Sequence, residues 1–147
     1  MKSYFSNVVG VGELYLEYVF SEFEGEPILF VCSDRVGELY LCVCTEIRYE
    51  QDWIITLVDK IQMKEMIKQN KDIRSAFIES EKIILINMTI DGSESSKAVK
   101  YEEVDPIELP DKGVYIQCDI PKAMDYLREP KLNFCIANCQ VKCNVFE

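Results

Sequence analysis

The chain has 147 residues, a net charge of -10 from 26 acidic and 16 basic residues, and no histidine. The lack of histidine excludes Ser-His-Asp and Cys-His catalysis and every histidine-ligated metal site. The acidic balance disfavours binding to nucleic acid or anionic lipid and favours cationic partners.

A single domain over residues 1–147 is expected, because this length and 48% hydrophobic content suit one core. No apolar run approaches the ~20 residues that cross a bilayer. Residues 1–7 also lack the apolar segment of a secretory signal. We therefore expect a soluble, cytoplasmic protein.

The hexapeptide Val-Gly-Glu-Leu-Tyr-Leu occurs twice, at residues 11–16 and 36–41. Each copy starts an alternating segment, followed by an acidic turn and a second apolar run at residues 27–32 or 53–58. This order predicts a four-stranded antiparallel meander. The residues of the first strand expected to share its inward face are Leu14, Leu16, Tyr18 and Phe20.

Two helices are predicted after the meander. Asp59 with Gln62 three positions later forms a capping box, so the first helix begins near Lys60. Residues 69–71 end it, and Asp72 caps a second short helix. Its buried stripe should be Ile73, Ala76 and Phe77.

Alternation of apolar and polar residues resumes at Lys82 and predicts another strand. The turn Asp91-Gly92 then predicts a hairpin whose second arm includes residues 97–102. An irregular acidic loop follows over residues 102–111. Residues 114–118 are then predicted to form a short strand.

A helix is predicted to start after Asp119 and to stop before Pro130. The alternation from Cys135 to Val145 predicts a long C-terminal strand that closes or extends the sheet. The expected fold class is therefore α+β. It combines a mainly antiparallel bent sheet or partly open barrel of six to eight strands, a helical pair after the fourth strand, and a short helix before the last strand.

The seven cysteines include no Cys-x-x-Cys pair, so no disulfide framework is predicted. On a strand, Cys135, Cys139 and Cys143 would lie ~13 Å apart, too far to share one zinc ion. The common phosphate-binding glycine motifs are missing as well. We expect no metal, no cofactor, and thiols that are reduced and mostly buried.

Two acidic turns of the meander form the densest candidate site. They occupy equivalent places and both combine carboxylates with an aromatic residue. The candidate residues are Glu22, Phe23, Glu24 and Glu26 in the first turn, and Glu46, Tyr49, Glu50 and Asp52 in the second. Solvated turns are one interpretation; a docking surface for a basic protein partner, with the aromatics as anchors, is the other.

The expected function is a non-enzymatic interaction module, such as an inhibitor, an immunity or antitoxin-like protein, or an accessory subunit. A carboxylate- or cysteine-dependent enzyme is the alternative from another class, although no residue requires a catalytic role. An acidic mimic of nucleic acid is a third interpretation. The sequence leaves the oligomeric state open.

The strand order, the segment at residues 72–77 (Asp-Ile-Arg-Ser-Ala-Phe) and the pattern Leu109-Pro110-x-x-Gly113 resemble small bacterial domains of unknown function. The resemblance covers about residues 10–118. It implies a prokaryotic cytosolic setting and supplies neither an activity nor site residues.

Overall fold

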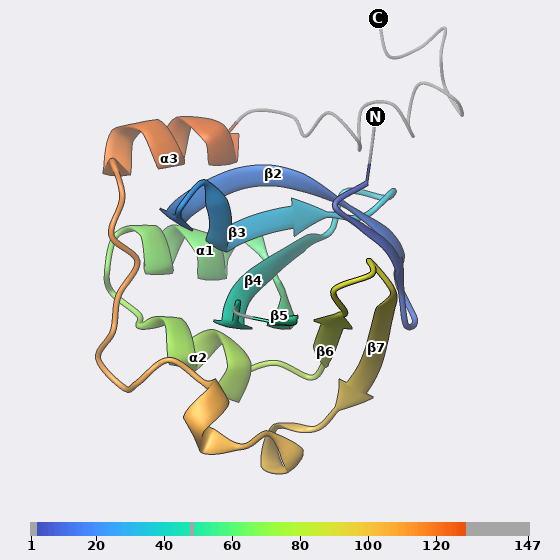
Figure 1. Ribbon diagram of the computed structural model, residues 1–147. Helices are drawn as coiled ribbons and strands as arrows, with labels where there is room; N and C mark the ends of the chain where they lie inside the picture. The colour runs from blue at the N-terminus through green and yellow to red at the C-terminus, as the bar shows by residue number, and fades with distance from the viewer. Residues whose placement is uncertain (1–2, 48, 129–147) are drawn as a thin grey trace, which may run out of the picture.

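The computed structural model describes residues 3–47 and 49–128. Seven strands form one sheet in which each strand pairs antiparallel with the next along the chain, and the sheet curls into a nearly closed barrel (Figure 1). The strands are β1 Phe5–Val8, β2 Gly12–Phe23, β3 Glu26–Ser33, β4 Leu39–Glu46, β5 Gln51–Val58, β6 Ile83–Met88 and β7 Glu94–Val99. The helices are α1 Lys60–Ile67, α2 Ile73–Ile78 and α3 Ile120–Arg128, with short 3-10 turns at Tyr101–Glu103 and Pro106–Glu108.

The prediction of an antiparallel, barrel-like sheet of six to eight strands is confirmed. The α+β label is not confirmed, since the described part of the chain is mostly β. The helical pair follows the fifth strand instead of the fourth, because β1 adds a strand before the predicted meander. Only Phe5 and Val8 of β1 are buried, which is too short an alternation to predict a strand.

Side chains of β7 close the barrel against β1. The Glu94 carboxylate accepts hydrogen bonds from the backbone N–H groups of Ser6, at 2.9 Å, and Asn7, at 3.0 Å. The Ser96 hydroxyl accepts from the backbone N–H of Val9 at 2.8 Å. The edge of β1 therefore has its donors satisfied without a backbone ladder to β7.

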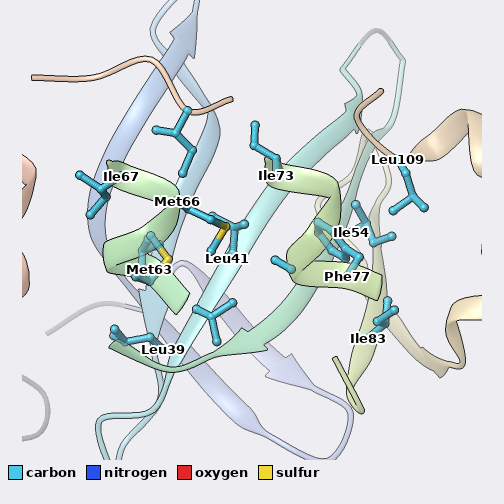
Figure 2. Close-up of a cluster of buried hydrophobic side chains, with 14 of the residues drawn as sticks. Leu39, Leu41, Ile54, Met63, Met66, Ile67, Ile73, Phe77, Ile83 and Leu109 are labelled. Carbon is cyan, nitrogen blue, oxygen red and sulfur yellow. The ribbon is translucent and has the colours of Figure 1, made fainter. Parts of the chain in front are cut away.

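Two hydrophobic cores lie on the two faces of the sheet. Strand alternation divides the side chains between them, as in β4, where Leu41 faces outward and Tyr40 and Cys42 face the barrel interior. Figure 2 shows α1 and α2 side by side over the outer face, with Met63 and Phe77 directed toward the sheet. Buried residues on both faces explain why the strands hold such continuous apolar runs.

The predicted common face of the first long strand is wrong, because β2 contains a bulge. Leu16 lies opposite Cys32, whereas Tyr18 lies opposite Val31, so Glu17 is an extra residue. Leu14 consequently packs inside the barrel, while Tyr18 packs in the outer core. Strict alternation assumes an uninterrupted ladder, and the bulge reverses the face.

The predicted caps of the first two helices are confirmed. The Asp59 carboxylate accepts from the backbone N–H of Gln62 at 2.7 Å, the Gln62 side chain accepts from the backbone N–H of Asp59, and Asp72 caps α2. The strand predicted at residues 114–118 is wrong. That segment is irregular and is held by the buried Ile116 and by a 2.9 Å bond from the Gln69 side-chain amide to the Ile116 carbonyl.

The helix predicted after Asp119 is present as α3, which ends at Arg128. The long strand predicted from Cys135 to Val145 lies outside the described residues. No helix in the described part of the chain has the length and apolar character needed to span a membrane.

Candidate functional site

Three turns gather at one end of the barrel and line a concavity of about 660 Å³. Neighbouring strands are antiparallel and follow one another along the chain, so every second turn lies at the same end. These are the β2–β3, β4–β5 and β6–β7 turns. The lining residues are Phe23, Glu24, Glu26, Ile47, Tyr49, Gln51, Met88, Thr89 and Ile90, and we call this site the three-turn concavity.

The β2–β3 turn is a tight two-residue turn that fixes the position of Phe23. Phe23 pairs with Glu26 across the hairpin, and Glu24 and Gly25 between them both have positive φ, of 50° and 83°. Positive φ at both central residues is typical of a type I′ turn, whose twist matches that of the flanking strands. The aromatic ring is thus presented from a regular hairpin end.

The β6–β7 turn is stabilised by its own polar side chains. The Asp91 carboxylate accepts hydrogen bonds from the Thr89 hydroxyl and from the backbone N–H of Ser93. These bonds, the Thr89 bond first, hold the pKa of Asp91 below its usual range. A turn restrained in this way keeps Ile90 at the concavity.

Three large apolar side chains, one from each turn, are exposed at the three-turn concavity. The exposed fractions are 53% for Phe23, 81% for Tyr49 and 80% for Ile90. Single exposed apolar residues are common on protein surfaces, but a group around one hollow is a frequent feature of protein-binding surfaces. Ile90 was not among the predicted site residues. Its place beside the other two turns depends on the complete strand order, which puts the Asp91-Gly92 turn at the same end of the barrel.

The eight predicted site residues separate into two groups. Phe23, Glu24, Glu26 and Tyr49 line the concavity. The other four, Glu22, Glu46, Glu50 and Asp52, do not line it.

Asp52 has a structural contact instead. It lies opposite Asn87 on β6, whose side-chain amide donates a 2.6 Å hydrogen bond to its carboxylate. Glu46 lies opposite Asp52 at the end of β4, and its carboxylate accepts from the backbone N–H of Ile47. Both carboxylates therefore stabilise the ends of strands.

The charge around the concavity is strongly negative. The sequence of its three turns and of the strand ends beside them holds the carboxylates Glu22, Glu24, Glu26, Glu46, Glu50, Asp52, Asp91 and Glu94. It holds one basic residue, Arg48, which lies outside the described residues. Such an imbalance attracts a cationic surface over several ångströms in low salt.

The described cysteines are not suited to nucleophilic chemistry. Cys32, Cys42, Cys44 and Cys118 are all free thiols. Burial raises the pKa of the Cys42, Cys44 and Cys118 thiols, which keeps them protonated at neutral pH. The remaining three, Cys135, Cys139 and Cys143, lie outside the described residues.

A metal centre has no support in the structure either. No group of three or more cysteine, aspartate or glutamate side chains among residues 3–47 and 49–128 could hold a metal ion. The three-turn concavity combines carboxylates with exposed apolar side chains.

Comparison with known proteins identifies one family. No curated protein and no solved structure matches the chain. A family model matches residues 3–133, which include every strand, helix and turn described above. The chain therefore belongs to DUF6575, a family of unknown function.

Proposed function

We propose that the protein is a non-enzymatic interaction module that binds a basic protein partner at the three-turn concavity. An inhibitor, an immunity or antitoxin-like protein, or an accessory subunit would all act in this way. The observation that carries the proposal is the grouping of Phe23, Tyr49 and Ile90, from three separate turns, around one hollow that also holds Glu24 and Glu26. A set of merely solvated turns does not require exposed apolar residues that converge.

The two kinds of side chain have different tasks in this proposal. Carboxylates at the rim speed the encounter with a basic surface, and their effect falls with added salt. The apolar side chains lose their exposed area in the complex and so slow dissociation. The partner should therefore present an apolar side chain surrounded by lysine or arginine.

The enzyme alternative has less support. A cysteine-dependent reaction needs an accessible thiolate, whereas burial keeps the described thiols of Cys42, Cys44 and Cys118 protonated. The proposal also includes a cytosolic, bacterial setting and reduced thiols at Cys135, Cys139 and Cys143. An acidic mimic of nucleic acid would use the same carboxylates, and added duplex DNA would compete for its partner.

The test measures association and dissociation of a partner first isolated on the wild-type protein and then purified. Glu24→Lys with Glu26→Lys should slow association at least tenfold at low salt and reduce its salt dependence. The control pair Glu102→Lys with Asp111→Lys makes the same charge change at two exposed positions of the segment 101–111. It should leave the association rate within a factor of two.

The apolar contribution is measured in the same experiment. Phe23→Ala should speed dissociation about fivefold or more, equivalent to ~1 kcal/mol. Ile107→Ala, at an exposed residue of the 3-10 turn Pro106–Glu108, is the matched control. Unchanged rates for both concavity variants would contradict the proposal, and slower association for the control pair would move the interface to residues 102–111.

A further inference from the structure

A second surface, of opposite charge, lies between two helices. Figure 1 shows α3 alongside α1, and a groove of about 360 Å³ separates their outer sides. The residues lining it are Lys60, Ile61 and Lys64 from α1 and Met124, Leu127 and Arg128 from α3. We call it the α1–α3 groove.

The floor of the α1–α3 groove is apolar. Leu127 is buried and Met124 partly buried, and both pack in the outer core. Ile61 stands above them on the exposed side of α1, with 75% of its surface accessible. The buried stripe of this helix is formed by Met63, Met66 and Ile67 instead. Ile61 therefore contributes little to the packing of the described fold.

The rim of the groove is basic in a protein of net charge -10. Lys60 and Lys64 lie one helical turn apart, Lys68 continues the row, and Arg128 faces them from α3. No hydrogen bond or ion pair joins the ammonium groups of these three lysines to a described residue, whereas Lys71 just beyond them binds Glu79 at 2.9 Å. Arg128 already forms an ion pair with Asp125 of its own helix. Lys60 and Lys64 are therefore the cations at the apolar floor that are available to a partner.

We propose that the α1–α3 groove docks an acidic amphipathic helix of a protein partner. Leucine-like side chains spaced three and four residues apart would cover Ile61, Met124 and Leu127, as in other complexes of a helix in a groove. Carboxylates beside that apolar stripe would meet Lys60 and Lys64 through charge-assisted hydrogen bonds.

Charge complementarity selects this occupant over extended polyanions. The acidic remainder of the molecule repels a bilayer or a nucleic acid, which spreads negative charge over a wide area. A short helix meets mainly the local cations, because distant charges are screened beyond ~8 Å at physiological salt. The α1–α3 groove thus prefers an acidic partner, whereas the three-turn concavity prefers a basic one. The inference for the groove does not depend on the proposed function.

The test uses a synthetic 14-residue helical peptide with leucines along one face and glutamates elsewhere. Binding to the full chain is measured by fluorescence anisotropy at 0.15 M salt. We expect saturable one-to-one binding that Lys60→Glu with Lys64→Glu weakens at least tenfold. The control pair Lys97→Glu with Lys112→Glu, equally exposed and equal in charge change, should leave the affinity within twofold.

The apolar floor is tested separately. Ile61→Ser should weaken binding of the acidic peptide about fivefold, whereas Ile107→Ser, an equally exposed isoleucine elsewhere, should not. A peptide with lysines in place of the glutamates should show no loss of binding in the Lys60→Glu, Lys64→Glu variant. Circular dichroism of each variant verifies that the fold is retained.

Four results would overturn the proposal. The first is no binding of the acidic peptide. The second is equal loss in both charge-reversal pairs, which would show only general attraction. The third is binding to phosphatidylglycerol vesicles with the same dependence on Lys60 and Lys64, which would assign the groove to a lipid surface. The fourth is self-association that the groove variant abolishes and the peptide competes with, which would make a second copy of the chain the occupant.

Discussion

Removing the Glu94 carboxylate should open the junction between β1 and β7. This side chain accepts from the backbone N–H groups of Ser6 and Asn7 and from the Ser6 hydroxyl, at 2.9, 3.0 and 3.3 Å. Hydrogen bonds to charged groups contribute roughly 1.5–3 kcal/mol each when buried. These are exposed, so we assign ~0.5–1 kcal/mol to each of the two backbone bonds.

Glu94→Ala should therefore lower the free energy of unfolding by about 1–2 kcal/mol. At ~2–4 °C per kcal/mol for a chain of this size, the Tm should fall by roughly 2–8 °C. Glu94→Gln retains one acceptor, the side-chain amide oxygen, so its free energy of unfolding should fall by about half as much. Glu102→Ala, an exposed glutamate outside the junction, should stay within ~0.5 kcal/mol of the parent protein.

The assay combines calorimetry with amide hydrogen exchange at Ser6, Asn7 and Val9. Faster exchange at Ser6 and Asn7 in Glu94→Ala, with Val9 still protected by the Ser96 hydroxyl, is the expected pattern. Unchanged exchange at both residues, or a Tm equal to that of the Glu102 control, would refute the side-chain closure of the barrel.

Three further stability predictions concern the cores and one turn. Phe77→Ala should cost about 3–5 kcal/mol in urea unfolding, and Phe77→Leu about 1–2, because Phe77 is fully buried between α2 and the sheet. Glu24→Asn should raise stability by ~0.5 kcal/mol, since Asn-Gly suits a type I′ turn, while Gly25→Ala should lower it because φ is 83°. Burial raises the pKa of the Cys42 thiol, so the neutral form is favoured in the fold. The urea midpoint should hold below pH ~8.5 and fall as the pH rises above it, and part of that fall should be missing in Cys42→Ala.

Local signals in the sequence predicted local structure well. The Asp59 and Asp72 caps place the starts of α1 and α2, because a capping carboxylate and its N–H partner lie within three residues of each other. The Asp91-Gly92 turn similarly places the β6–β7 hairpin. The alternation of Leu39, Leu41 and Val43 with Tyr40, Cys42 and Cys44 likewise separates the two faces of β4, where the ladder is regular up to Cys44.

Features that depend on distant residues were missed. The extra residue Glu17 in β2 is visible only in the register with β3. Ile116 forms no strand because its segment is held by the side chain of Gln69, two residues after the end of α1, and by the burial of Ile116 in the core. Both depend on tertiary contacts that a pattern in one segment does not contain.

The candidate site was predicted in part for the same reason. Phe23 and Tyr49 were found because acidic turns with aromatics are evident in the sequence. Asp52 was included with them, although its strand alternation directs it to Asn87 on the neighbouring strand. Ile90 was missed because its turn was predicted as a separate hairpin, and its place beside the others follows only from the complete strand order.

The most direct measurement of the central claim is site-specific photo-crosslinking at the three-turn concavity. A benzophenone amino acid replaces Phe23 in one protein and Ile107 in another, and each is irradiated with the purified basic partner. The expected result is a crosslinked complex from position 23 that disappears with Glu24→Lys and Glu26→Lys and weakens in high salt. No crosslinked complex is expected from position 107. Equal crosslinking from both positions, or crosslinking from position 23 that the charge reversal leaves unchanged, would contradict the central claim.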